Sequence, residues 1–289
     1  MQPHEYATRA RRRQEAGDLD GAMQDVGEAL RLDRRHAEAF HVRAHIRRDR
    51  GQYRRSIRDF KRAARLAPHD YRNFYCRSCA RRLRRDWKGA LRDLDAALRM
   101  CPTAALALNY RGFLLLELGR LDEALDDYAR TLEIDPNHLD AAHNRGLCLE
   151  RQGDLRGAEA AYTRSLKIRP DSAHAFQSRG NVRRDLRDLG GAVSDWTRSL
   201  ALDPSSVPVT YKRGLALLSL GHPDEAYGDF TRATELDPQH ADAYCGRAEV
   251  WRIRGSRADA VRNLETALAV APRRWARRRA VEAELEALS

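Results

Sequence analysis

The chain has 289 residues and a formal net charge of +11, and 42% of its residues are hydrophobic, 33% charged and 7% aromatic, which is typical of a globular, water-soluble protein rich in small apolar side chains. No window reaches 18 apolar residues, which argues against a membrane-spanning helix, and five scattered cysteines argue against a disulfide framework. The first residues lack the apolar core of a secretory signal, so we expect a cytoplasmic location, with a nuclear one as the alternative.

Prolines mark a regular repeat along the chain. Seven of them stand 34 residues apart without a slip, at Pro68, Pro102, Pro136, Pro170, Pro204, Pro238 and Pro272. A fixed period of this length predicts a solenoid of stacked modules. The period defines eight repeats, at 3–36, 37–70, 71–104, 105–138, 139–172, 173–206, 207–240 and 241–274.

Each repeat predicts a helix, a short turn and a second helix. Positions 8, 20 and 27 of the repeat carry small side chains, whereas position 24 is apolar and often bulky, as at Trp196. Steps of three and four residues place positions 20, 24 and 27 on one helical stripe. Glycine at position 15 in six repeats ends the first helix, and proline at position 32 ends the second. Residues 275–289, with Trp275, Val281, Leu285 and Leu288, predict a helix that covers the last repeat, the alternative being a frayed end.

These columns resemble the tetratricopeptide repeat over residues 3–274. The match consists of a small residue at position 8, glycine at 15, alanine at 20, an aromatic residue at 24, alanine at 27 and proline at 32. The resemblance implies an all-α fold, a right-handed α-solenoid superhelix of eight antiparallel helix pairs plus a C-terminal capping helix, in a single domain over 1–289. The sequence departs from the family pattern at Arg34, which replaces a proline, and at Arg85 and Arg187, which replace the turn glycine.

Two charged columns accompany the small ones. Position 7 is arginine in all eight repeats, and position 23 is aspartate in six. Because both columns flank the small contact positions, we predict a partly buried guanidinium–carboxylate bridge between the two helices of a repeat. The alternative is an arginine ladder that faces a ligand. The predicted structural pairs are Arg43 with Asp59, Arg77 with Asp93, Arg111 with Asp127, Arg179 with Asp195, and Arg213 with Asp229.

The resemblance also implies a concave groove lined by the first helices, with positions 2, 5, 9 and 12 facing a partner. The predicted groove residues are His41, His45, Arg48, Arg72, Tyr75, Arg82, Asn109, Phe113, Leu116, His143, Leu147, Gln177, Asn181, Arg184, Tyr211, Leu215 and Leu218. Exposed Phe113, Leu116, Tyr211, Leu215 and Leu218 would make part of this surface apolar, as a peptide ligand requires. The alternative is that part of this set is buried between neighbouring first helices.

The net charge is concentrated in the first three repeats. Residues 1–104 hold 26 Lys or Arg and 14 Asp or Glu, and such a basic lobe can attract an acidic peptide or another polyanion. However, only four of the 53 basic residues are lysine, which indicates a compositional bias toward arginine. The acidic residues interleaved with the basic ones disfavour nucleic-acid binding.

No motif predicts catalysis. The chain has no phosphate-binding loop and no nucleophile elbow, so we predict no catalytic residue, no cofactor and no enzyme activity. Cys76 and Cys79 form a CxxC without a second one, and they are interpreted as packing residues rather than a metal or redox site. His41 and His45 lie four residues apart, but no third metal ligand is evident, so we predict no metal site.

The sequence therefore predicts a non-catalytic protein–protein interaction scaffold that binds a peptide or helix of a partner protein in its groove. One alternative is electrostatic binding of RNA or another polyanion by the basic N-terminal repeats. Another is a targeting subunit of an enzyme complex. We expect neither membrane insertion nor a small-molecule substrate.

Overall fold

The computed structural model describes residues 1–288, and within that range it contains seventeen α-helices and no strand. This confirms the predicted all-α repeat solenoid. The helices are α1 (Pro3–Glu15), α2 (Leu19–Leu32), α3 (Ala37–Asp49), α4 (Tyr53–Leu66), α5 (Arg72–Leu83), α6 (Trp87–Met100), α7 (Ala105–Glu117), α8 (Leu121–Ile134), α9 (Leu139–Gln152), α10 (Leu155–Ile168), α11 (Ala173–Asp185), α12 (Leu189–Leu202), α13 (Val207–Ser219), α14 (Pro223–Leu236), α15 (Ala241–Ile253), α16 (Arg257–Val270) and α17 (Arg278–Leu288). None of these helices is long and apolar enough to cross a membrane.

The turn inside each repeat has a left-handed residue at position 15. The six glycines there have φ between +71° and +84°, as Gly51 and Gly153 do at the two extremes. Arg85 and Arg187 take the same conformation, with φ of 61° and 67°. A left-handed residue other than glycine costs roughly 1–2 kcal/mol. The two departures from the family pattern therefore keep the turn and add local strain.

A bulky side chain from the second helix fills the space beside a small residue of the first. In the sixth repeat, Trp196 on α12 is fully buried against Gly180 on α11, where an added Cβ would lie 2.7 Å from Trp196 Nε1. Gly146 and Tyr162 make the same contact in the fifth repeat. Positions 8 and 24 therefore pair as hole and knob in these hairpins, at a packing density that leaves no room for a methyl group.

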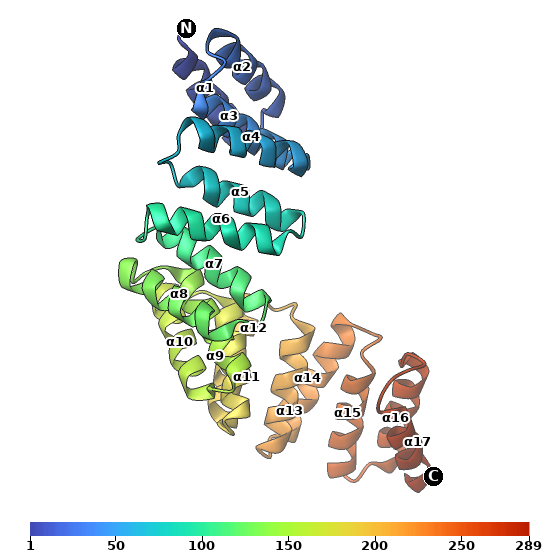
Figure 1. The fold of residues 1–289 in the computed structure, drawn as a ribbon. Helices are drawn as coiled ribbons and strands as arrows, with labels where there is room; N and C mark the ends of the chain where they lie inside the picture. The colour runs from blue at the N-terminus through green and yellow to red at the C-terminus, as the bar shows by residue number, and fades with distance from the viewer. Residues whose placement is uncertain (289) are drawn as a thin grey trace. The chain divides into compact units, whose positions relative to one another are not determined.

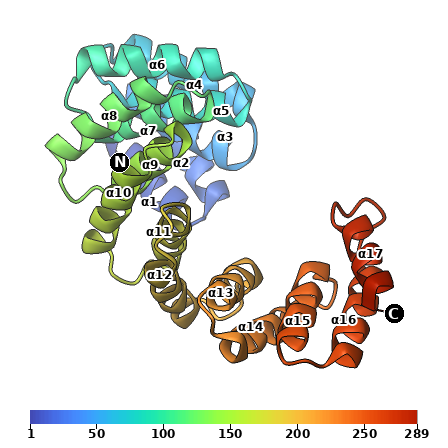
Figure 2. The same cartoon turned by 90° about the horizontal axis from the view of Figure 1, so that it is seen from below.

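The chain divides into two compact units, an N-terminal unit of residues 1–141 and a C-terminal unit of residues 142–289, of which Ser289 lies outside the described residues. Figure 1 shows that helix pairs follow one another in chain order within each unit. Figure 2 gives a second view, in which α13, α14, α15 and α16 again lie side by side. The single domain over 1–289 and its superhelical path stay predictions.

Both units place first helices next to each other. Helix α3 contacts α1 and α5 in the N-terminal unit, and α13 contacts α15 in the C-terminal unit. At the end of the described chain, α17 packs on α16 through buried Val281, and Trp275 and Leu285 join the same apolar cluster. We call the surface formed by positions 2, 5, 9 and 12 of the first helices the first-helix face of each unit.

Candidate functional site

Arginine at position 7 and aspartate at position 23 meet inside each of the six hairpins that carry both residues. In the seventh repeat, Arg213 donates from Nε (2.8 Å) and Nη2 (2.6 Å) to the two oxygens of Asp229. The same two-pronged contact joins Arg9 with Asp25, Arg43 with Asp59, Arg77 with Asp93, Arg111 with Asp127, and Arg179 with Asp195. All six carboxylates are buried. We call these contacts the Arg–Asp ladder.

The geometry keeps the ladder charged. The hydrogen bond to Asp229 raises the pKa of Arg213, and the hydrogen bond from Arg9 lowers the pKa of Asp25. Burial opposes both shifts because it disfavours charge, but the paired partner outweighs it. In both groups the pairing favours the charged form. This arrangement is consistent with a scaffold role for the column rather than a row of arginines free to take a ligand.

A second arginine column supports the ladder. Arg13, Arg47, Arg81 and Arg183 occupy position 11, one helical turn after position 7, and each lies within 3.2 Å of the same aspartate. These contacts were not predicted from the sequence. The sequence does carry a signal for them, because position 11 is arginine in repeats 1, 2, 3 and 6 and apolar in the other four. An arginine at i+4 from another arginine faces the same partner across the hairpin.

The guanidinium also reaches back to the preceding repeat. Its Nη1 atom donates to position 25 of that repeat: Arg111 to Asp95 (2.8 Å), Arg179 to Thr163 (3.1 Å) and Arg213 to Thr197 (3.1 Å). Each of these arginines therefore joins three helices. The sequence offers no column signal for this contact, because position 25 varies between glycine, lysine, alanine, carboxylate and hydroxyl residues.

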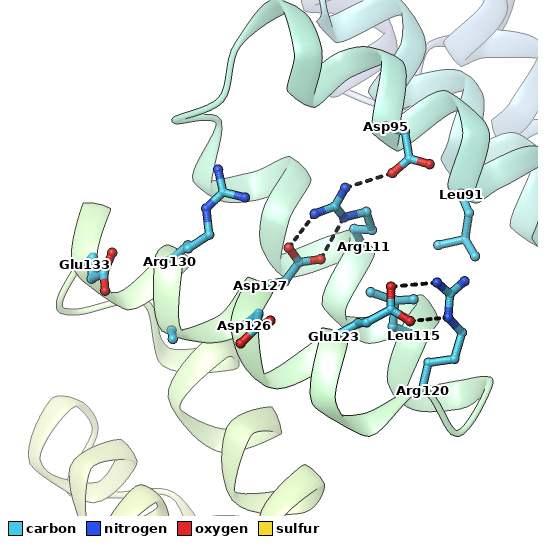
Figure 3. A pocket seen from close by; sticks show the side chains of 11 residues that line it. Leu91, Asp95, Arg111, Leu115, Arg120, Glu123, Asp126, Asp127, Arg130 and Glu133 are labelled. Carbon is cyan, nitrogen blue, oxygen red and sulfur yellow. Dashed lines mark hydrogen bonds and ion pairs between the residues drawn. The ribbon is translucent and has the colours of Figure 1, made fainter.

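A cavity of about 520 Å³ borders this ladder in the N-terminal unit. Five of its eight charged residues are paired with one another (Figure 3): Arg111 lies between Asp95 and Asp127, and Arg120 pairs with Glu123. The pairing leaves these charges with little to offer a ligand. We interpret this cavity as part of the scaffold.

The first-helix face of the N-terminal unit carries an aromatic cluster. Tyr110 stacks on Phe113 with ring centroids 6.2 Å apart, and Tyr75 meets Tyr110 edge-on at 5.7 Å. Arg82 Nε donates to the Tyr110 hydroxyl (2.7 Å), and its guanidinium lies over both the Tyr110 and Phe113 rings. All four side chains are half-buried. The structure thus brings together three predicted groove residues, Tyr75, Arg82 and Phe113, with Tyr110 added.

Two predicted groove residues are buried, and the expectation that they are exposed was wrong. Leu116 is 2% exposed and His41 is 8% exposed. A helical side chain leans toward the preceding turn, and Leu116 lies one turn after the small contact residue Gly112. His41 is held by Asn73 of α5 (2.7 Å) and lies against the Phe60 ring. Position in the repeat alone does not reveal these neighbours.

The first-helix face of the C-terminal unit has a cavity of about 320 Å³ lined in part by Arg184, Lys212 and Leu215. Lys212 Nζ donates to Asn181 Oδ1 at 3.1 Å, and burial lowers the pKa of Lys212. Leu215 is 40% exposed. This cavity therefore offers an apolar surface beside three cationic side chains, of which Arg187 is the third.

The remaining predicted groove residues are distributed as follows. Arg48 pairs with Asp49, Arg72 with Asp70, and Arg184 with Asp185. His143 lies against the Tyr162 and His174 rings, and Tyr211 against His240. His45, Asn109, Leu147, Gln177 and Leu218 are half-buried.

Part of the basic lobe borders a cavity on α3 and α4 in the N-terminal unit. A cavity of about 480 Å³ is lined by seven cationic side chains and one carboxylate, namely Arg43, Arg47, Arg55, Arg58, Asp59, Lys61, Arg62 and Arg65. Burial lowers the pKa of Arg47 despite its contact with Asp59. The sequence predicts excess charge in this region but not that seven cationic side chains line one cavity.

Comparisons with known proteins agree with this architecture. Two family models described as tetratricopeptide repeat match the chain, one at residues 103–171 and the other at residues 143–207 and 211–261. No protein of curated function matches the chain.

Several solved structures share the fold. YrrB, described as a TPR protein with an unusual peptide-binding site, is 22% identical over 67% of this chain and 97% of its own, with a TM-score of 0.60. A tetratricopeptide repeat protein from Parabacteroides merdae is 18% identical over 87% and 98%, with a TM-score of 0.59. The C-terminal part of a TPR protein from Cytophaga hutchinsonii is 17% identical over 78% and 93%, with a TM-score of 0.68.

Proposed function

Because this chain belongs to the tetratricopeptide repeat family, whose fold suggests a protein–protein interaction scaffold, we propose that it holds an extended peptide or a short helix of a partner protein on its first-helix faces. The scaffold acts without catalysis. The observation that carries the proposal is the cavity of the C-terminal unit, where exposed Leu215 lies beside Lys212 and Arg184.

The chemistry of this cavity indicates the kind of peptide it takes. Leu215 offers an apolar contact, and Lys212 is oriented by its hydrogen bond to Asn181. A peptide with an apolar side chain next to a carboxylate satisfies both groups. Because the surface is built on helices that pack on their neighbours, binding needs little ordering of the scaffold. The peptide-binding site named for YrrB belongs to that protein, and it supports the proposal as a property found on a similar fold.

Peptides selected on the full chain from a random library test this proposal. We expect the dissociation constant of the selected peptides to rise about 10-fold in Leu215→Ala, because burial of a leucine contributes roughly 1.5–3 kcal/mol and 1.4 kcal/mol corresponds to a factor of ten. Isothermal titration calorimetry measures the change. Leu202→Ala is the matched control, because Leu202 is 45% exposed but lies at the end of the second helix α12. Equal effects of the two variants would contradict a binding role for this face.

The basic cavity on α3 and α4 favours a second candidate function, the binding of a polyanion such as RNA. Its seven cationic side chains surround a single carboxylate, Asp59. Counterion release makes such binding strongly dependent on salt. A peptide held by apolar contacts depends on salt only weakly.

This candidate is tested by the affinity for a single-stranded RNA homopolymer between about 50 and 200 mM salt. Binding through phosphate contacts loses about tenfold or more in affinity across this range. We expect Arg58→Ala and Arg65→Ala each to reduce the slope of log affinity against log salt by about 0.7, the loss of one phosphate contact. Arg198→Ala is the control, because Arg198 is exposed on α12 of the C-terminal unit. A flat salt dependence, or an equal effect of all three variants, would exclude the basic cavity as the binding surface.

A further inference from the structure

Three potential metal ligands meet inside the N-terminal unit. His41 and His45 lie one turn apart on α3, and Cys76 comes from α5 of the next repeat. One ligand atom from each residue lies within 4.8 Å of the other two. His41 and Cys76 are both 8% exposed, and His45 is half-buried. The sequence alone shows no third ligand for His41 and His45. The packing of α3 on α5 brings Cys76 beside them as the third ligand.

The two imidazoles are oriented for ligation. His41 Nδ1 lies 2.7 Å from Oδ1 of buried Asn73. Because a carbonyl oxygen only accepts hydrogen bonds, Nδ1 carries the proton and Nε2 keeps a lone pair. That Nε2 atom faces His45 Nε2 at 3.1 Å. A carbonyl that fixes the tautomer from behind in this way is characteristic of metal-ligating histidines.

The spacing of the nitrogens fits a shared ion. With metal–nitrogen distances of about 2.0–2.1 Å, two nitrogen ligands of a three-coordinate ion at an angle of about 120° are about 3.5 Å apart, which is close to the 3.1 Å between the two Nε2 atoms. Burial lowers the pKa of His41, and it lowers the pKa of His45 to about 3. Burial raises the pKa of Cys76 to about 12. Metal ligation uses the unprotonated forms of histidine and cysteine, so binding displaces the thiol proton.

The charges around the cluster select the ion. Arg11 and Arg48 face His45, while Arg72 and Asp70 face His41. A monovalent ion bound to one thiolate and two neutral imidazoles leaves the centre uncharged, whereas a divalent ion leaves it with a positive charge among arginines. Soft sulfur and imidazole ligands in a three-coordinate set suit Cu(I). A cavity of about 220 Å³, lined by His41, His45 and Arg72 among others, offers a path from solvent.

We propose that His41, His45 and Cys76 form a binding site for Cu(I). Binding replaces the proton of the Cys76 thiol with the ion, so one proton is released and no electron is transferred. The site is distinct from the cavity at Leu215 that carries the proposed function, because that cavity lies in the other unit.

Anaerobic titration of the reduced full chain with Cu(I), in competition with the chelator bicinchoninate, tests the site. We expect one equivalent to bind and the affinity to fall by more than about 100-fold in Cys76→Ser, since loss of a ligand exceeds the 10–100-fold effect of an outer-shell change. Cys79→Ser is the matched control: Cys79 lies on the same helix, burial also raises its pKa, but it hydrogen-bonds with Tyr110 and is not in the cluster.

His45→Gln provides a second variant, because it removes the ligand at a half-buried position while keeping a polar side chain of similar size. We expect it to weaken Cu(I) binding as Cys76→Ser does, while circular dichroism of both variants keeps the helical signal of the native chain. Three results would overturn the proposal: no stoichiometric Cu(I) binding, equal losses in Cys76→Ser and Cys79→Ser, or Zn(II) binding without Cu(I) binding.

Discussion

Replacing Arg213 with alanine is expected to lower the free energy of unfolding of the C-terminal unit by about 3 kcal/mol. The carboxylate of Asp229 is buried, and among the described residues Arg213 is its one ion-pair partner. Without the guanidinium, the carboxylate is left buried without its ionic partner. The contact from Arg213 to Thr197 of the preceding repeat is lost as well. The expected loss in unfolding free energy lies at the lower end of the range for buried ion pairs, because Arg213 is partly exposed.

Two other alanine variants provide the contrast. Arg179→Ala is expected to cost about 2 kcal/mol, because Arg183 Nη1 remains 3.1 Å from Asp195 Oδ2 and keeps part of the pairing. Arg184→Ala is expected to cost less than about 1 kcal/mol, because Arg184 pairs only with its exposed neighbour Asp185 among the described residues. Equilibrium urea unfolding of the full chain, combined with hydrogen exchange in α13 and α14, measures the order of the three losses in unfolding free energy. If the three variants were equally stable, the ladder would be a solvated feature.

Replacing Gly180 with valine is expected to lower the free energy of unfolding by about 3 kcal/mol. A Cβ at this position would lie 2.7 Å from Trp196 Nε1 and 2.8 Å from its Cδ1. The indole is fully buried, so it cannot swing into solvent to make room. The clash exceeds the gain in helix propensity on replacing glycine, which is below about 1 kcal/mol.

Gly228→Val is the matched control for this clash. Gly228 lies in the middle of α14, and no atom lies within 4 Å of a Cβ built there. The same substitution should therefore leave stability unchanged or raise it by less than about 1 kcal/mol, through propensity alone. Thermal unfolding of the two variants, followed by circular dichroism, separates the effects. A similar melting temperature for both would mean that the hairpin can open to admit the side chain.

The fold was predictable because each local signal agreed with the period. Proline at position 32 and the small residue at position 8 recur in register, so a helix pair can be located without knowledge of its neighbours. The left-handed turn at Arg85 and Arg187 was not read from those residues, whose type disfavours it. It follows from the stacking of the surrounding helices, which overrides one unfavourable position.

The candidate sites were predictable only where both partners lie in one repeat. Positions 7 and 23 are 16 residues apart in every repeat, so these two columns predict pairs such as Arg179 with Asp195. The burial of Leu116, the contact from Arg213 to Thr197 and the approach of Cys76 to His45 depend on packing between helices of neighbouring repeats. No pattern or spacing of residues within a single repeat predicts these three features.

The reach of Arg111, Arg179 and Arg213 to position 25 of the preceding repeat ties the length of the connecting loop to a specific contact. One additional residue in the loop between α12 and α13 would lengthen the connection between Thr197 and Arg213, whereas Arg213 and Asp229 would stay 16 residues apart. An insertion or deletion there would thus disturb the contact between repeats and leave the contact within the repeat in place. The unbroken 34-residue interval between the seven prolines keeps this connection at one length along the chain.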